Sequence, residues 1–402
     1  MRISFVLAAL LVSAVATAAP APETVTADQA VALYRERSTR LQAAKGDVGI
    51  AEADIVGAQI YPNPSIGLST TNTVGGTDTI GHSQETLSLD IPILIGHQRG
   101  KREAAAKAHV EATKVSIDAD AATVEFEIRH RVVALQAAQE KTASITAAVD
   151  DAKKLREIVV GRTAAGASSN YAVARMDLAI AALSSRVDEA KADELAASHA
   201  VGVAVGIADW APHASAALAP TATADEAAVD ATHPALALPQ REQTAARADE
   251  ETAHAEAVPT PSLQLAAFAT TDPGGVAVTG GVAIPLPMFD RNQGAVAKAH
   301  AEARRAELEL TARKDELSAA LSSARDDLRV RRDALAKFQT DAVSHLDKLR
   351  EMAEAAYKNG QGGIVELLDA HDAITDARMR EIDLRAAVVD GEVTLRSAAR
   401  GR

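Results

Sequence analysis

The sequence predicts a mainly α-helical fold with a small β part, in which one unit of helix, β-hairpin and long helical hairpin occurs twice. A strand-like segment at 282–284 leads through Pro285 and Pro287, which lack the N–H that a ladder needs, into a proline-free stretch from Ala295 to Tyr357. A helix of about 60 residues is about 90 Å long, and compact domains rarely contain one. Aromatic residues make up only 2% of the chain and alanine is abundant, so small side chains are expected to let the helices pack closely.

The same strand-to-helix junction occurs earlier in the chain. Three matches fall in one order at spacings between 193 and 197 residues, which indicates an internal duplication. The matching parts are 62–68 with 259–265, 89–92 with 282–285, and Gly166 with Gly360. We therefore expect two copies of one unit, although the length of 402 residues would also suit two or three unrelated domains.

The N-terminal segment 1–19 is predicted to be a secretory signal peptide. Arg2 provides a basic end, an apolar run follows at 3–15, and Ala16-Thr17-Ala18 matches a small-residue cleavage site. The chain contains no cysteine, so neither disulfides nor a lipidated N-terminal cysteine are expected. No later stretch reaches ~18 consecutive apolar residues, so we expect any membrane contact to be made by β-strands.

The first repeat, 20–207, is expected to open with a helix that breaks near Ser38 and stops before Pro62 and Pro64. Its remaining elements are a β-hairpin at 64–92, a long helix at 98–160, a tip at 161–170 and a return helix at 171–205. The long helix carries a heptad stripe, which indicates an antiparallel helical hairpin with a coiled-coil seam. The stripe consists of Val110, Ile117, Val124, Ala138, Ile145, Ala152 and Val159.

A connector at 208–232 is expected to lead into the second repeat, 233–402. This repeat restates the plan, with a first helix, a β-hairpin at 261–285, a long helix at 291–358, a tip at 359–363 and a return helix at 364–397. Asp290 and Gln293 have the spacing of a capping box at the start of the long helix. Its predicted seam contains Leu317, Leu321, Ala324, Leu328, Leu335, Phe338, Ala342, Leu349, Met352 and Ala356.

Four strands in one chain cannot close a barrel. An open sheet edge in lipid would leave unpaired backbone groups that cost several kcal/mol each, so closure requires other chains. Three copies would supply about twelve strands, enough for a barrel with an aqueous lumen. The predicted assembly is a trimeric 12-stranded β-barrel continued by an α-helical coiled-coil tunnel.

Longer motifs carry a family resemblance that spans the predicted mature chain. They are Tyr61-Pro62-Asn63-Pro64, Glu85-Thr86-Leu87-Ser88-Leu89, the run from Ile284 to Gly294, and Ala356-Tyr357-Lys358-Asn359-Gly360 followed by Glu366-Leu367-Leu368-Asp369-Ala370. On these residues the chain resembles the TolC-like outer-membrane factors, also called outer membrane efflux proteins. Within that family it looks like the CzcC-type heavy-metal efflux branch.

The resemblance implies a homotrimeric channel-tunnel held in outer-membrane lipid, with a long periplasmic extension. It also implies that the channel docks a periplasmic adaptor, or membrane fusion protein, and an inner-membrane RND-type pump. The branch implies export of divalent cations such as cobalt, zinc and cadmium. One alternative is the same channel exporting drugs or other small molecules. A periplasmic coiled-coil adaptor is a less favoured alternative, because it would carry one helical hairpin and more strands.

In such a channel the two tips would lie at the periplasmic mouth. Glycine permits positive φ and close approach of another backbone, although these glycines can equally serve only to make a turn. The residues predicted to contact the adaptor are Gly161, Gly166, Ser168, Asn359, Gly360 and Gly363.

Just after the second tip, Glu366 and Asp369 match acidic positions that form a pore constriction in related channels. They are three residues apart and therefore share a helix face. Three chains would gather these carboxylates around one axis, where they would attract cations. The first repeat has Ala172 and Arg175 at the matching positions, so the ring would come from the second repeat alone. The alternative is a solvated helix face.

No other chemistry is predicted. The chain has no nucleophile motif, phosphate loop or paired catalytic set, so neither an enzyme nor a cofactor is expected. Its 11 histidines are scattered without metal-ligand spacing, so no dedicated metal site is expected either. His371, close to Asp369 and Asp372, is interpreted as an ordinary tip residue in preference to a cation contact. The net charge of −13 argues against a nucleic-acid partner.

Overall fold

The computed structural model describes residues 21–72, 83–207, 209–221, 232–271 and 274–400. The predicted signal peptide at 1–19 lies outside these residues, and so do positions 208 and 222–231 of the connector and the loop segments 73–82 and 272–273. Among the described helices, none combines the length and the apolar composition that a membrane span requires.

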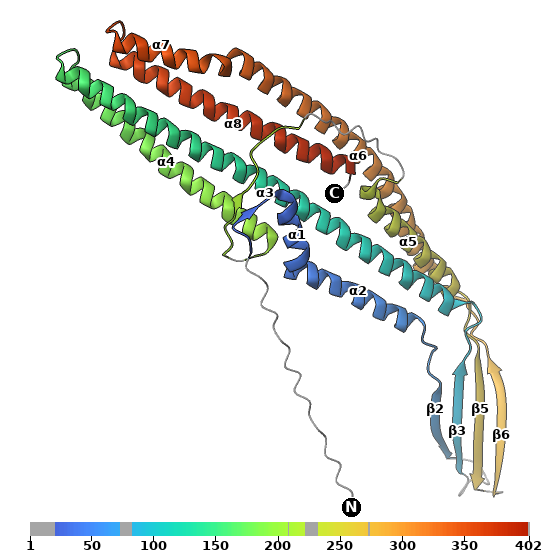
Figure 1. Ribbon diagram of the computed structural model, residues 1–402. Coiled ribbons are helices and arrows are strands. Elements are labelled where there is room, and N and C mark those ends of the chain that lie inside the picture. Colours follow the sequence, from blue (N-terminus) through green and yellow to red (C-terminus); the bar gives the residue numbers. More distant parts are fainter. Residues whose placement is uncertain (1–20, 73–82, 208, 222–231, 272–273, 401–402) are drawn as a thin grey trace, which may run out of the picture.

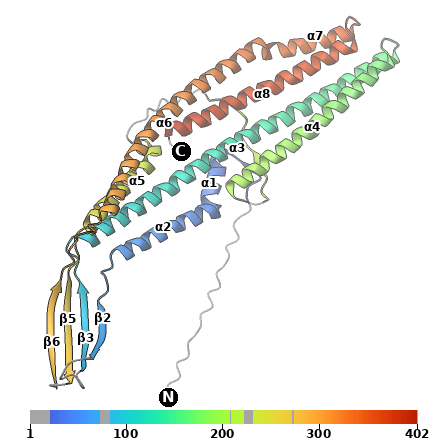
Figure 2. The ribbon, with the colours of Figure 1, turned by 180° about the vertical axis from the view of Figure 1, so that it is seen from behind.

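The chain is elongated, with a β-sheet at one end and two helical hairpin turns at the other (Figure 1). The view from behind shows the long helices running side by side between these ends (Figure 2). The helices are α1 (Ala27–Arg37), α2 (Thr39–Ala58), α3 (Gln98–Ala164), α4 (Asn170–Val205), α5 (Ala237–Glu256), α6 (Gln293–Asp341), α7 (Leu346–Lys358) and α8 (Ile364–Arg400). Two 3₁₀ turns, η1 (Pro234–Leu236) and η2 (Val343–His345), precede α5 and α7.

The sheet is antiparallel and joins the two repeats. Its strands, in spatial order, are β2 (Ser65–Asn72), β3 (Ser83–Pro92), β5 (Ser262–Thr271) and β6 (Gly274–Ala283). The central pair, β3 with β5, connects the hairpin of the first repeat to that of the second. A separate two-residue parallel pair, β1 (Thr24–Val25) with β4 (His213–Ala214), ties the N-terminal segment to the chain that follows α4.

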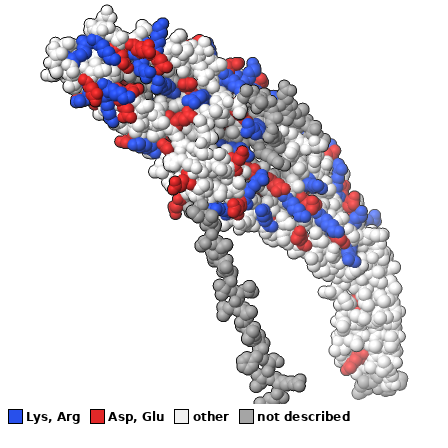
Figure 3. Space-filling view, in the orientation of Figure 1, with Lys and Arg blue, Asp and Glu red and all other residues white. Residues whose placement is uncertain are grey.

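One face of the sheet is mainly apolar, although Thr70 and Glu85 face one another on it near the end where β2 and β3 are joined. Facing pairs such as Leu68 with Leu87, Leu89 with Leu265 and Leu263 with Val282 put aliphatic side chains on the same side. The opposite face is mainly polar. It carries Ser, Thr and Gln side chains, several glycines, Ala266, Phe268 and Ala277, together with Asp90, whose carboxylate accepts hydrogen bonds from Ser262 Oγ and Gln264 Nε2. Lysine and arginine are absent from these strands, whereas both charge signs cover the helices (Figure 3).

The backbone enters the long helix in the same way in both repeats. His97 and Asn292 have left-handed φ values of 57° and 60° just before α3 and α6. The glutamine that follows each one accepts a hydrogen bond from the backbone N–H two residues before it, at 2.9 Å for Gln98 and 2.7 Å for Gln293. The predicted capping box is therefore wrong. Asp290 accepts from the backbone N–H of Asn292, and the left-handed Asn292 makes Gln293 the first helical residue.

The second long helix is interrupted, which corrects the continuous helix predicted at 291–358. α6 ends at Asp341, Ala342 has φ −122° and ψ −61°, and η2 then separates α6 from α7. A 3₁₀ turn advances by about 120° per residue, whereas an α-helix advances by about 100°. The interruption therefore rotates the side chains of α7 relative to the stripe of α6.

The rotation changes which apolar residues are buried. Leu335, before the interruption, is buried as the heptad pattern predicts. After it, Leu346 and Tyr357 are buried, whereas Leu349 and Met352 of the predicted seam are 40% and 60% exposed. The seam predicted from the sequence is thus correct along α6 and wrong along α7.

The first tip is shorter than predicted. α3 continues to Ala164 and α4 begins at Asn170, so Gly161 lies inside a helix and not in the turn. A glycine within a helix costs only about 1 kcal/mol, which the packing of α3 on α4 offsets. At the C-terminal end, α8 extends to Arg400 and passes the predicted end at residue 397.

Candidate functional site

The two tips have the same turn geometry. Gly166 and Gly360 have φ values of 73° and 74°, a left-handed conformation that strains residues with a Cβ atom. In the first tip, Ala167 N–H donates to Arg162 O at 2.8 Å. In the second tip, Gln361 N–H donates to Ala356 O at 2.9 Å. Gly166 N–H also donates to Thr163 O at 3.0 Å, and Gly360 N–H donates to Tyr357 O at 3.1 Å. Together these bonds form a Schellman motif that satisfies the last carbonyls of each helix.

The two tips are joined to one another. The Tyr357 and Ser168 hydroxyls lie 3.2 Å apart. The Arg162 guanidinium lies 4.8 Å from the centre of the Tyr357 ring and also donates to Ala167 O at 3.1 Å. These contacts connect the end of α7 to the turn between α3 and α4.

An apolar cluster lies beneath these polar contacts and contains side chains from both hairpins. Met176 of α4 and Leu367 of α8 are almost completely buried in it. The other buried members are Leu155, Val159, Ala172, Tyr357, Ile364 and Leu368. Because neither hairpin supplies the cluster alone, the tips depend on one another for their packing.

The predicted constriction residues lie on the first two turns of α8. Glu366 and Asp369 are both exposed and share one face of the helix. The carboxylate of Glu366 also accepts a hydrogen bond from the backbone N–H of Gly363, so it caps its own helix. A carboxylate at this end is favoured by the helix dipole. Glu366 therefore has a local structural role, whereas Asp369 projects into solvent within the described chain.

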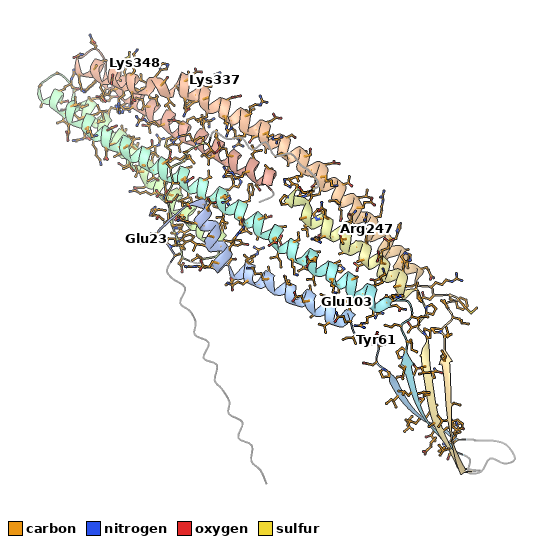
Figure 4. The ribbon with its side chains drawn as sticks, turned by 45° about the vertical axis from the view of Figure 1, so that its right-hand side comes forward. Glu23, Tyr61, Glu103, Arg247, Lys337 and Lys348 are labelled. Carbon is orange, nitrogen blue, oxygen red and sulfur yellow. The ribbon has the colours of Figure 1, made fainter. Side chains whose placement is uncertain are left out.

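The structure brings together five of the six predicted tip residues. Gly166 and Ser168 lie in the first turn, and Asn359, Gly360 and Gly363 lie between α7 and α8; only Ser168 is partly buried. Figure 4 shows that the tips lie far from the sheet, with Lys348 near the tip end and Tyr61 at the opposite end of the helices, close to the sheet. The sixth residue, Gly161, is exposed on the last turns of α3.

Sequence reasoning missed the contacts made by Arg162 and Tyr357. Tyr357 was part of the motif that carries the family resemblance, but its hydroxyl partner Ser168 is 189 residues away in the sequence. An aromatic residue just before a turn glycine was the available signal. It indicated an important position without identifying the partner.

His371 of α8 lies in the ion-pair network behind the tip. Burial lowers the pKa of its imidazole, and this effect outweighs the opposing influence of the nearby Glu354 and Asp151 carboxylates. Its Nε2 atom is buried without a hydrogen-bond partner in the described structure. The neutral form is therefore favoured, as expected for a residue held by packing. The described residues contain no group of three or more side chains arranged to hold a metal ion.

Comparison with known proteins gives a family match over the second repeat and a single relative that aligns with most of the chain. A model of the family described as "Outer membrane efflux protein" matches residues 229–400, which cover the second repeat. The cobalt-zinc-cadmium resistance protein CzcC of Cupriavidus metallidurans is 26% identical over 392 residues, covering 92% of this chain and 89% of that protein. The similarity to this relative therefore extends through the first repeat as well.

Solved structures share the fold along almost the whole chain. The structure of CusC superposes with a TM-score of 0.74 at 15% identity, covering 94% of this chain and 93% of that one. The outer-membrane channel OprN superposes with a TM-score of 0.72 at 19% identity, covering 94% of this chain and 90% of that one. The predicted fold class, mainly helical with a small sheet, is confirmed.

Proposed function

We infer that this chain, which belongs to the outer membrane efflux protein family, is the outer-membrane channel of an efflux system and passes divalent heavy-metal cations to the exterior. The family expected from the sequence motifs is thus the correct one. The observation that carries the choice of cargo is the similarity to a cobalt-zinc-cadmium resistance protein across both repeats. The matched family is described as an outer membrane efflux protein and OprN as an outer-membrane channel, which supports the expectation that the chain is not an enzyme.

The edges of the sheet support a homotrimer. β2 and β6 lie at the two ends of the strand order, so among the strands that the structure describes each has a neighbour on one side only. Unpaired strand edges are not tolerated in lipid. Three copies side by side would pair β6 of one with β2 of the next. The mainly apolar face would meet outer-membrane lipid, with Glu85 near the end of the strands away from the helices. The polar face with Asp90 would line the lumen, and the helices would extend into the periplasm.

The tips are the proposed docking surface for a periplasmic adaptor that connects the channel to an inner-membrane RND-type pump. Gly166, Gly360 and Gly363 expose backbone where another chain can approach closely, and Ser168 and Asn359 flank them. Gly161, on the adjoining surface of α3, belongs to the same proposed contact. Exposed polar backbone at a glycine turn offers hydrogen bonds without the steric cost of a side chain.

The cargo is tested by measuring cell-associated cobalt, zinc, cadmium and copper in a strain that lacks the protein and in the same strain after complementation. We expect one or more of these metals to accumulate without the protein and to return to the original level on complementation. Sensitivity to hydrophobic drugs with no change in metals would retain the channel and replace the cargo.

Glu366 and Asp369 are the proposed constriction at the tip end of the pore. Their shared exposed face supports this assignment, because three chains would bring six carboxylates near one axis. Glu366→Gln keeps an acceptor for the Gly363 N–H while removing the charge, and Asp369→Asn is its counterpart. In a planar bilayer, both variants are expected to reduce cation selectivity.

Asp315→Asn, which removes one exposed carboxylate from α6 far from the tip, is the matched control. It should leave selectivity unchanged. If the Glu366 and Asp369 variants behave like this control, neither residue lines the pore.

A further inference from the structure

α7 has a wider apolar face than one partner covers. Leu346 and Tyr357 lie on the half of this face that packs inside the chain, and both are buried. Leu349 and Met352 lie on the other half, about 60° to 120° further around the helix, and are exposed to the extent of 40% and 60%. The interruption at Ala342 produces this division, because it rotates α7 away from the stripe that α6 buries. The exposed leucine and methionine on adjacent turns form a small apolar patch on the surface of the chain.

α4 carries a second unpartnered apolar surface at the same end of the molecule. Tyr171 and Leu178 are two turns apart on its outer side, and each is 62% exposed. Ala174, Ala181, Ala182 and Ser185 are exposed near them and are small and uncharged. Asp177, exposed beside this surface, is paired with Arg156 of α3. A shallow surface of small residues between an aromatic and an aliphatic side chain can receive a helix closely.

The two helices that carry these surfaces lie on opposite borders of the chain. Figures 1 and 2 show α6 and α7 along one long border and α2 and α4 along the other, with α3, α5 and α8 between them. The strands follow the same order, with β2 on the side of α2 and β6 on the side of α6. A ring that pairs β6 of one copy with β2 of the next therefore places the α7 border of one copy beside the α4 border of its neighbour. Two different surfaces that meet head to tail are what a closed ring requires.

The surfaces also lie at the same level along the helices. Leu349 is eleven residues before Gly360, and Leu178 is twelve residues after Gly166. The contact between Tyr357 and Ser168 keeps the two tips level with one another. Side chains equally far from their tips therefore meet when two copies stand side by side.

We propose that the interruption at Ala342 turns α7 so that Leu349 and Met352 pack against Tyr171 and Leu178 of the neighbouring copy. This inference rests on the ring of copies proposed above and identifies a contact at its tip end. α6 buries its seam within its own chain, whereas α7 divides its apolar face between its own α8 and a second copy. The neighbouring copy would thus supply Tyr171 and Leu178 to complete the packing of α7. Leucine and methionine with a tyrosine are typical of the buried centre of a protein interface.

The test uses the absence of cysteine from the natural chain. The double variant Leu178→Cys with Leu349→Cys is treated with a mild oxidant or a short bis-maleimide in outer-membrane vesicles, and the products are separated by mass under denaturing conditions. Covalent dimers and trimers are expected, because the two thiols of neighbouring copies would lie close together. A link within one chain would leave the mass unchanged.

The matched control is Leu178→Cys with Val330→Cys. Val330 is an apolar residue at least as exposed as Leu349, 59% against 40%, and lies on the other side of the interruption, thirty residues before Gly360. The yield of linked chains from the Leu349 pair should exceed that of the control on the order of tenfold, because close, oriented thiols react at a high effective concentration. Equal yields from the two pairs would indicate random collision and overturn the proposal.

The native mass of the unlinked protein in detergent separates failure of the α7–α4 contact from failure of the trimeric ring. A trimer whose Leu349 pair does not link would overturn this tip contact and leave the proposed channel intact. A monomer with correctly folded helices by circular dichroism would overturn the ring itself. A trimer in which the Leu349 pair forms covalent dimers and trimers and the Val330 pair does not would support both the ring and the α7–α4 contact.

Discussion

The long arm of the first hairpin is one helix of 67 residues, whereas the corresponding arm of the second is divided into α6, η2 and α7. Leu155 and Leu349 both lie eleven residues before their tip glycines, yet Leu155 is 5% exposed and Leu349 is 40% exposed. The two copies therefore keep the same spacing of apolar side chains but bury different parts of it. Duplication preserved the spacing of the apolar side chains, and the neighbouring elements of each copy determine which of these side chains are buried.

Unlike the long helices, the tip turns are almost identical in the two copies. Both contain a left-handed glycine and the same backbone hydrogen bonds. A turn is specified by a few adjacent residues, so it survives changes elsewhere. The side of a helix that is buried depends on neighbours from distant parts of the chain.

The strongest test of the shared tip cluster is Leu367→Ala. Leu367 is 1% exposed among side chains of both hairpins, so the substitution should lower the stability of the tip by about 2–5 kcal/mol. Hydrogen exchange of backbone amides near both turns measures the loss. Val365→Ala, which removes an exposed side chain two residues away, is the control and should have an effect within about 0.5 kcal/mol. Protection that falls only in the second hairpin would show that the tips are independent.

Substitution of the turn glycines tests whether the two tips are equivalent. Gly166→Ala and Gly360→Ala should each cost about 1–2 kcal/mol, because alanine is strained at positive φ. Gly161→Ala should have the opposite sign and stabilise α3 by about 0.5–1 kcal/mol. Thermal unfolding followed by far-ultraviolet circular dichroism gives the sign of each change. A loss of stability for Gly161→Ala would indicate that this residue belongs to the turn and not to α3.

The hydroxyl contact between the tips is expected to contribute less. Tyr357→Phe and Ser168→Ala each remove one partner of the same hydrogen bond and should each cost about 0.5–1.5 kcal/mol. The double variant should cost little more than either single variant, because both lose the same interaction. Additive losses in the double-mutant cycle would mean that the two hydroxyls act separately.

The smallest expected effect is a dependence on pH carried by His371. Burial lowers its pKa in the folded protein, so below the unfolded value of about 6.5 the unfolded chain binds a proton that the folded chain does not. This difference lowers stability as the pH falls through that range. His371→Gln should therefore reduce the decrease in Tm between pH 7.5 and pH 5. An unchanged decrease would assign the pH dependence to other groups.

Much of the architecture could be predicted from the sequence, because its signals are local. The prolines near the strands, the heptad stripe of α3 and the glycines of the two turns each reflect the backbone preferences of a few neighbouring residues. Element ends were less predictable. Gly161 carries no local sign that it is helical, and Asn292 adopts a left-handed conformation that an ordinary capping pattern does not reveal.

The sequence by itself determined the duplicated order of helices and strands, the alternation that gives the sheet one apolar face, and the positions where the hairpins turn. Only the tertiary structure decided where α6 ends, which half of the apolar face of α7 is buried, and that Tyr357 meets Ser168. The physical reason is that periodicity defines a stripe of apolar side chains but not its partner. The partner depends on residues that fold into contact from the other repeat, 189 positions away in the case of Tyr357.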